Sequence, residues 1–265
     1  MTATFGVEGE PFYFGADASL LGVHHAPLHA PGRSCGVVIC NPFGHEYIRA
    51  HRALRQLAVR LARAGFHTLR FDYYGCGDSV GSDESGTIMR WLADISAAID
   101  ELRRRSGAPC VSLVGLRLGA SLSAQVAAER KDVASLVLWE PVVNGQAYLD
   151  QLKEFHQEKI WYFLSKASSS QAELVGFPLT ESMRADLERL DLLSHSRKPA
   201  DTVLVIEGES DAFAQRLDEH LTQSGVTVLH QHVPSPRIWT EDPDKGLVPH
   251  QTLQAIVTWL TGACA

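Results

Sequence analysis

The sequence lacks the long apolar run that a membrane-spanning helix needs, which is about 18 consecutive apolar residues. Residues 1–10 also lack the basic region and the apolar core of a secretory signal peptide. These two absences predict a cytoplasmic protein that does not use a membrane as a partner.

Basic clusters are equally scarce. The net charge is −7, and the longest basic run, Arg103-Arg104-Arg105, lies where a helix is predicted to end. Cations at a helix C-terminus are favoured by the helix dipole, so this run needs no ligand to explain it. An acidic chain of this kind is not expected to bind nucleic acid.

Cysteine and histidine follow no metal-binding pattern. The five cysteines include no CxxC pair, and their odd number favours free thiols. His45, Glu46 and His51 form HExxxxH rather than the HExxH that places two imidazoles on one helical face. We therefore expect no metal and no other cofactor.

What the sequence does contain is an alternation of apolar strand-like runs with amphipathic helical patterns. This alternation is typical of a parallel sheet wrapped by helices. Strands are expected at 34–41, 66–73, 110–114, 134–139, 202–207 and 226–232. Helices are expected at 50–64, 87–105, 119–129, 212–223 and 249–260. Near the N-terminus, 12–14 and 20–24 are expected to pair as an antiparallel hairpin at one sheet edge.

The alternation is interrupted between residues 145 and 200. This stretch is rich in aromatic residues, contains a serine linker at 168–170 and has no strand-like run. We interpret it as a helical lid inserted into a single domain that covers residues 1–265, a length suited to one α/β domain. The aromatic residues at 155–163 are expected to form the core of the lid, with some of them facing a substrate.

One pentapeptide between a predicted strand and a predicted helix carries most of the functional information. It reads Gly115-Leu116-Arg117-Leu118-Gly119. A G-x-S-x-G sequence in this context is the nucleophile elbow of α/β-hydrolases, where the glycines permit a strained and tightly packed turn. Both glycines are present here, but Arg117 stands where the serine nucleophile belongs.

The chain resembles the α/β-hydrolases of the serine aminopeptidase-like branch over residues 12–262. Besides the elbow, the resemblance rests on Asn41-Pro42-Phe43-Gly44-His45-Glu46, on the D-x-x-G-x-G-x-S-like turn at 72–79, and on His250 before a Trp-containing helix. It implies an α/β-hydrolase fold with a mostly parallel sheet flanked by helices. It also implies hydrolysis of acyl compounds, including thioesters.

The resemblance further implies positions for the other catalytic groups. The acid falls on Asp211 and the base on His250, with Glu209 and Glu140 as rival acids. The oxyanion hole falls on the backbone N–H of Leu118 and of Phe43 or Gly44. Glu46 follows this loop and is able to pair with Arg117 or Arg49, or to remain solvated.

Three interpretations of Arg117 stay open. A guanidinium remains protonated and cannot act as a nucleophile, but at a helix N-terminus it suits a carboxylate, a phosphate or a developing oxyanion. The fold is alternatively catalytically inactive and binds a ligand or a partner. In the third interpretation Arg117 forms a structural ion pair or the nucleophile has moved, with Cys76 as its best candidate and Ser79 and Ser121 as weaker ones.

Two functions follow from these interpretations. The first is an enzyme that processes an ester or thioester carrying an anionic group, free or bound to a carrier or coenzyme A. His250 and Asp211 would supply the general base and Arg117 would bind the anion or oxyanion, with lyase-type chemistry also open. The second is a non-catalytic hydrolase fold that binds a small molecule or a protein. The oligomeric state is left open by the sequence.

Overall fold

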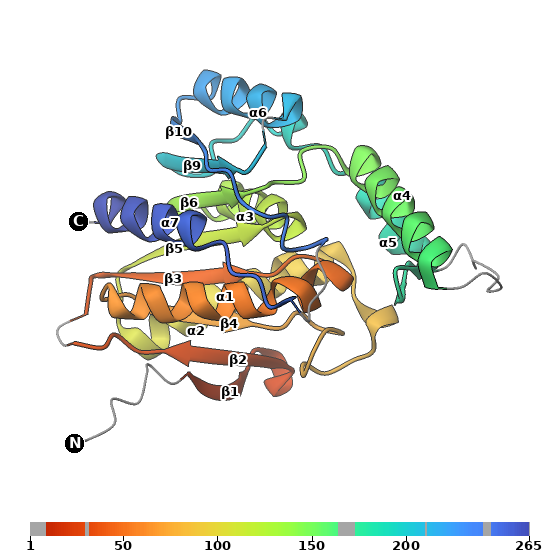
Figure 1. Ribbon diagram of the computed structural model, residues 1–265. Coiled ribbons are helices and arrows are strands. Elements are labelled where there is room, and N and C mark those ends of the chain that lie inside the picture. The colour runs from red at the N-terminus through yellow and green to blue at the C-terminus, as the bar shows by residue number, and fades with distance from the viewer. Residues whose placement is uncertain (1–8, 30–31, 164–172, 210, 241–244, 265) are drawn as a thin grey trace.

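The computed structural model describes residues 9–29, 32–163, 173–209, 211–240 and 245–264. Its centre is an eight-stranded sheet of order β1-β2-β4-β3-β5-β6-β9-β10. Figure 1 shows the parallel strands running toward the side of the molecule where α4 and α5 lie. The carboxyl ends of the strands therefore meet at that side, where open α/β sheets bind their ligands.

The six consecutive strands from β4 to β10 in this order pair in parallel. Most of their residues are buried, because helices cover both faces of the sheet. This burial explains why their sequences are continuously apolar rather than alternating. Their bounds are Cys35–Cys40 (β3), His67–Phe71 (β4), Cys110–Leu116 (β5), Val133–Trp139 (β6), Thr202–Glu207 (β9) and Thr227–His232 (β10).

The N-terminal hairpin forms the other edge of the sheet, as the sequence predicts. Strand β1 (Glu10–Phe14) pairs antiparallel with β2 (Leu20–His25), and β2 pairs antiparallel with β4. The predicted α/β-hydrolase arrangement of a mostly parallel sheet between helices is thus confirmed.

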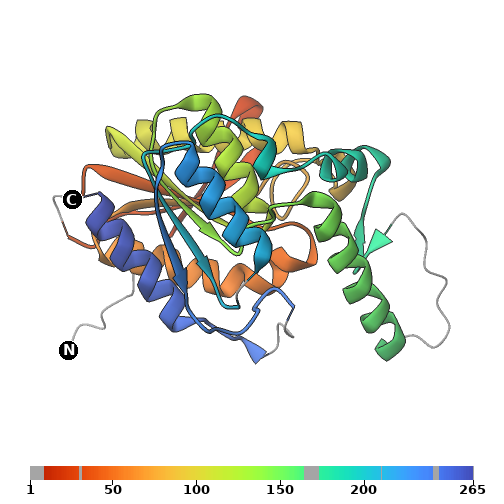
Figure 2. The ribbon, with the colours of Figure 1, turned by 90° about the horizontal axis from the view of Figure 1, so that it is seen from above.

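Two helical layers enclose the sheet (Figure 2). Helices α1 (His45–Arg63) and α7 (His250–Ala263) pack on one face, against Val37, Val114 and their neighbours. Helices α2 (Ile88–Ser106), α3 (Leu118–Arg130) and α6 (Ala212–Gln223) pack on the other face. Helix α1 begins five residues earlier than its apolar periodicity indicates, and this extension brings Glu46 into its first turn.

The segment between β6 and β9 contributes α4 (Gly145–Phe163) and α5 (Glu181–Glu188). Two short strands, β7 (Glu173–Leu174) and β8 (Phe177–Pro178), form a small hairpin that the sequence pattern does not indicate. Short 3-10 helices lie at Ala16–Ala18, Asp83–Ser85 and Leu192–Ser194. The serine linker predicted at 168–170 lies outside the described residues. The role of 145–200 as a lid stays a prediction.

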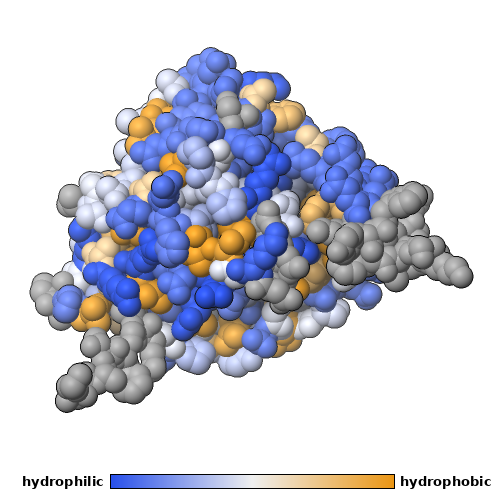
Figure 3. Space-filling model, in the orientation of Figure 1, coloured by the Kyte–Doolittle hydropathy of each residue, from blue (hydrophilic) through white to orange (hydrophobic). Residues whose placement is uncertain are grey.

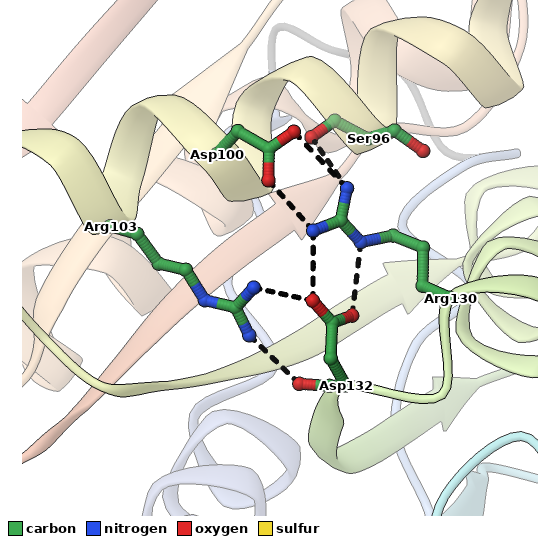
Figure 4. Close-up of polar contacts among 5 residues, drawn as sticks. All are labelled: Ser96, Asp100, Arg103, Arg130 and Asp132. Atoms are coloured by element: carbon green, nitrogen blue, oxygen red, sulfur yellow. Dashed lines mark hydrogen bonds and ion pairs between the residues drawn. The ribbon is translucent and has the colours of Figure 1, made fainter.

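An ion-pair network lies at the end of the sheet opposite to α4 (Figure 4). Arg130 at the end of α3 contacts Asp100 of α2 at 2.7 Å and Asp132 at 2.9 Å. Arg103 donates to the same Asp132 carboxylate and to its carbonyl oxygen. The hydrogen bonds from Arg130 are the first cause that lowers the pKa of Asp132 to about 2. The network ties α2 to the turn between α3 and β6.

Hydrophilic side chains cover most of the face drawn in Figure 3, with apolar ones in small patches. Such a mixture is ordinary for the surface of a folded domain. Within the described part of the chain, no helix is both long enough and apolar enough to cross a bilayer.

The start of α3 packs against the end of β3 so closely that Gly119 has room for no side chain. A Cβ at this position would lie 2.4 Å from the carbonyl oxygens of Cys40 and Asn41. Backbone atoms cannot rotate away, so any larger residue must push the helix off the strand.

We expect Gly119→Ala to reduce the free energy of unfolding by about 3 kcal/mol or more. Gly262→Ala is the matched control, because Gly262 lies in α7 with nothing within 4 Å of the added methyl group. It should stabilise the protein by up to about 1 kcal/mol through helix propensity. Urea unfolding measures both effects, and equal stabilities of the two variants would contradict the packing.

Candidate active site

Arg117 occupies the turn between β5 and α3 in a strained backbone conformation. Its φ is 53° and its ψ is −123°, and its N–H donates to the Trp139 oxygen at 2.9 Å. Gly115 is required in front of it, because a Cβ there would lie 2.3 Å from the Ala120 Cα atom. The turn thus combines a positive φ with close packing, as a nucleophile elbow does, and has an arginine at its centre.

The guanidinium of Arg117 forms a buried ion pair with Glu46. Nε donates to Glu46 Oε1 at 3.1 Å, and the two side chains are only 12% and 2% exposed. Tyr148 of α4 donates its hydroxyl to Glu46 Oε2 at 2.7 Å. Both carboxylate oxygens of Glu46 thus accept hydrogen bonds, one from the elbow and one from the inserted segment.

Aromatic rings flank the same guanidinium. Its Cζ lies 5.3 Å from the centroid of the Tyr148 ring and 5.2 Å from that of the Trp239 ring, within the range of cation–π attraction. Nη2 also donates to Gln151 Oε1 at 3.0 Å. Residues from three distant parts of the chain therefore hold Arg117 in one orientation.

The pKa values within this cluster follow from burial and pairing. Burial acts to lower the pKa of Arg117, but the attraction of Glu46 and Tyr148 outweighs it and raises that pKa. Burial raises the pKa of Glu46, opposed by Arg117 and by the Tyr148 hydroxyl. Arg117 stays protonated, as its chemistry requires.

A cavity of about 650 Å³ opens beside Arg117 at the carboxyl ends of the strands. Among the described residues, six carboxylates line it against two guanidiniums, those of Arg117 and Arg237. These carboxylates are Glu46, Glu140, Glu154, Glu158, Glu209 and Asp211. The cavity is thus acidic, with its basic groups already paired, because Arg237 forms an ion pair with Glu209.

Glu140 differs from the other carboxylates of the cavity. It follows β6 directly, as Arg117 follows β5, and Leu116 and Trp139 are paired in the register of these strands. Its Oε1 accepts the Gly208 N–H at 2.6 Å, and no ion pair holds it within the described chain. Burial raises its pKa, partly opposed by the Gly208 N–H and by Arg117.

Asp211 reaches the same cavity but serves as a helix cap. Its Oδ1 accepts the N–H of Phe213 at 2.9 Å, which is the usual N-cap bond at the start of α6. Its rival Glu209 is exposed and paired with Arg237. Neither carboxylate contacts a histidine in the described structure.

The structure does not bring His250 to the cavity. His250 is the first residue of α7, is exposed, and bonds Arg60 through Nδ1. Arg60 lies fifteen residues along α1 from the cavity residue His45, or about 22 Å at the helical rise. The His250–Asp211 pair expected from chain order is therefore not formed, because His250 begins the last helix instead of preceding it in a loop.

Several residues at the cavity were not singled out by the sequence pattern. Tyr148 and Gln151 lie one turn apart on α4, and Trp239 lies in the segment before α7. The ring of His45 stacks on the ring of Phe155, with 5.0 Å between the two centroids. Phe155 belongs to the aromatic stretch predicted at 155–163. Burial is the first cause that lowers the pKa of His45 to about 3, and the charges of Arg49 and Arg117 lower it further. The imidazole of His45 is therefore neutral.

A smaller pocket of about 140 Å³ lies at the expected oxyanion loop. Phe43, Gly44 and Cys76 line the small pocket, whereas Leu118 begins α3 beside Arg117. Burial raises the pKa of the Cys76 thiol to about 12, which makes it a poor nucleophile. Within the described residues, no three His, Cys, Asp or Glu side chains gather as a metal site.

Comparison with known proteins gives this geometry a family. The family model of the serine aminopeptidases, S33, matches residues 32–222, which include β3, the elbow and most of α6. The chain belongs to this family of hydrolases. Its match to the mitochondrial palmitoyl-protein thioesterase ABHD10 is weaker, with 31% identity over 146 residues to the Bos taurus protein and 30% to that of Homo sapiens. These matches cover 52% of this chain and 45% of each relative, so the chain spans about half their length.

Solved structures of other hydrolases share the fold of this S33 family member. Est1E from Butyrivibrio proteoclasticus, in its ferulic acid complex, superimposes with a TM-score of 0.68 at 17% identity, over 95% of this chain and 98% of that one. The Pyrococcus furiosus esterase Pf2001 also gives a TM-score of 0.68, at 15% identity, over 100% and 96%. At sequence identities this low, the similarity to these structures shows a shared fold.

Arg117 is the ion-pair partner of the buried Glu46. We expect Arg117→Ala to lower the free energy of unfolding by about 3–5 kcal/mol, because it leaves Glu46 buried without that partner. The double variant Arg117→Met, Glu46→Leu should lose much less. Urea unfolding of Arg117→Met, of Glu46→Leu and of the double variant measures the coupling. The exposed pair Arg189–Asp186 is the control, with an expected effect of about 1 kcal/mol or less for Arg189→Ala. Strict additivity at Arg117 and Glu46 would contradict the ion pair.

Proposed function

We propose that this S33 family member hydrolyses an ester or thioester in the 650 Å³ cavity by direct attack of water, without an acyl-enzyme. The observation that carries the proposal is the side-by-side placement of Arg117 and Glu140 at the carboxyl ends of β5 and β6. One group is a permanent cation, and the other is a half-buried carboxylate outside any ion pair of the described chain.

Glu140 is the general base in this proposal. Its carboxylate takes a proton from water as the water oxygen attacks the acyl carbon. Collapse of the tetrahedral intermediate breaks the bond to the alkoxide or thiolate, which takes the proton back from Glu140 and leaves as the alcohol or thiol. Burial supports this role, because the raised pKa of Glu140 makes it a stronger base than an ordinary glutamate. Among the three acids that the sequence leaves open, the geometry therefore favours Glu140 over Asp211 and Glu209.

Arg117 stabilises the oxyanion. The first turn of α3, starting at Leu118, contributes backbone N–H groups that the helix itself leaves unpaired. A guanidinium and a helix N-terminus both favour the negative charge that develops on the carbonyl oxygen. Because Glu46, Tyr148 and Trp239 already hold Arg117 in place, little reorganisation is needed during the reaction.

The charge of the cavity also bears on the substrate. Arg117 by itself suggests a substrate with an anionic group, but Glu46 pairs with it, as Glu209 pairs with Arg237. Three further carboxylates, those of Glu154, Glu158 and Asp211, line the same cavity as Glu140. We therefore assign a neutral or cationic acyl substrate to the cavity.

A non-catalytic binding function is the second candidate. The contacts of Arg117 with Glu46 and Gln151 favour it, since they satisfy the guanidinium within the protein. The same cavity would then bind its ligand unchanged. A variant that loses turnover but still binds the ligand supports the enzyme. A protein that binds its ligand and shows no turnover supports the binding function.

Glu140→Gln should lower kcat for p-nitrophenyl butyrate by about 10²–10⁴-fold, the usual contribution of a general base. His250→Ala tests the alternative base from the sequence and should stay within about twofold in kcat. Glu188→Gln, an exposed carboxylate on α5, is the matched control. A wild-type protein without esterase or thioesterase turnover favours the binding function, and loss of activity in His250→Ala alone contradicts the role of Glu140.

The pH profile provides a second readout of the same base. Glu140 must be deprotonated to accept a proton, so kcat should be full above its pKa and fall as the pH drops through it. Because burial raises this pKa, the acid limb should lie above the ordinary value of 4.5. It should disappear in Glu140→Gln.

The charge preference is tested with two p-nitrophenyl esters of similar length, the butyrate and the hemisuccinate. We expect kcat/KM to favour the neutral butyrate by about tenfold, which corresponds to about 1.4 kcal/mol. The double variant Glu154→Gln, Glu158→Gln should reduce this preference, because it removes two carboxylates of the cavity. A preference for the hemisuccinate would instead support anion binding by Arg117.

A further inference from the structure

A second cluster of reactive side chains lies far from the cavity, at the amino ends of the parallel strands. Cys35 is the first residue of β3, while Ser112 and Ser135 lie near the starts of β5 and β6. Cys264 directly follows α7, which packs on the same face of the sheet as Cys35. Figure 1 shows the C-terminus of the chain at the end of the sheet opposite to α4.

The hydroxyl of Ser112 lies at the centre of this cluster. Its Oγ is 3.3 Å from Cys35 Sγ, 3.4 Å from Cys264 Sγ and 2.7 Å from Ser135 Oγ. Ser135 Oγ lies 3.8 Å from Cys264 Sγ. Residues separated by 229 positions in the sequence thus bring two sulfur atoms together.

The two thiols are not equivalent. The interaction with Cys35 is the first cause that lowers the pKa of Cys264, to about 6 against burial, with further contributions from Ser112, Ser135 and Arg33. The same interaction, together with burial, raises the pKa of Cys35. Cys264, which is partly exposed, is therefore the more acidic and more accessible thiol, and Cys35 is the buried one.

We propose that Cys264 and Cys35 form an oxidation-sensitive pair, in which a hydroperoxide converts the two thiols to a disulfide that fastens the end of α7 to β3. The shared contact with Ser112 carries the proposal, because it places a partly exposed sulfur next to a buried one. This site is independent of the proposed hydrolysis.

The reaction proceeds in two balanced steps. The Cys264 thiolate attacks one oxygen of hydrogen peroxide, the O–O bond breaks, and a sulfenic acid and hydroxide form. Cys35 sulfur then attacks Cys264 sulfur, and the S–O bond breaks. The departing hydroxide takes the Cys35 proton and leaves as water. Each sulfur supplies one electron of the two that reduce the peroxide.

Cys110 provides a rival partner and therefore a control. It lies opposite Cys35 in the register of β3 and β5, and its side chain is exposed. Cys40 and Cys76 are unsuited, because burial raises the pKa of each thiol to about 12. An oxidation that selects Cys264 over the more exposed Cys110 would reflect the hydrogen bonds of the cluster rather than access.

The test treats the full-length protein with a small excess of hydrogen peroxide. We expect two of the five thiols to be lost, an intact mass lower by two hydrogens, and a proteolytic peptide that links Cys35 to Cys264. Tm should rise by about 2 °C or more and return after dithiothreitol treatment, since the cross-link restrains the unfolded chain. Cys110→Ser should behave like wild type, whereas Cys264→Ser and Cys35→Ser should form no intramolecular disulfide.

Three outcomes would overturn the proposal. They are a disulfide that contains Cys110, oxidation of Cys264 to sulfinic acid without a cross-link, and the survival of all five thiols. Because esterase assays do not enter this experiment, its failure leaves the proposed hydrolysis unaffected.

Discussion

A buried ion pair between Arg117 and Glu46 organises the interior of this protein at the carboxyl ends of the strands. An arginine enclosed at the elbow must have a partner, because an isolated buried charge is strongly unfavourable. Glu46 supplies that partner from the first turn of α1, and Tyr148 connects the same carboxylate to α4. The sheet, a layer helix and the inserted segment are thereby joined through one carboxylate.

The strained backbone at the elbow has a cause that does not depend on catalysis. Gly119 has no room for a Cβ because α3 begins against the backbone of β3, and Gly115 has none because it faces the backbone of Gly119 and Ala120. The residue between them takes a positive φ, which costs about 1–3 kcal/mol for a residue other than glycine. A close packing of helix on strand thus accounts for the strained turn with arginine at its centre. The elbow then positions the Arg117 side chain as it would position a serine.

Much of the fold was predictable from the sequence, because its information is local. Continuous apolar runs specify the buried parallel strands, and 3-4 spacing specifies the helices between them. The start of α1 was not predictable in the same way, since His45 and Glu46 are buried through the contacts of the elbow and not through apolar periodicity. The β7–β8 hairpin likewise has only two residues in each strand, too few for a pattern.

The candidate site was only partly predictable. The motif locates Arg117, and the position of Glu46 after the expected oxyanion loop made it one possible partner, with Arg49 or solvent as its alternatives. His250 follows the chain order of the family, but chain order does not specify whether a residue precedes a helix or begins it. Tyr148 and Trp239 depend on the paths of two long connections, and neither path leaves a signal in the sequence around Arg117.

The ion pair also limits the chemistry open to the cavity. An anionic ligand would have to compete with Glu46 for Arg117, and it would enter past carboxylates on α4 and before α6. A carbonyl oxygen faces no such competition, because it becomes negative only during the reaction and needs a donor that is already oriented. The feature that makes Arg117 a weak receptor for anions, its fixed pairing with Glu46, is therefore the one that suits it to an oxyanion.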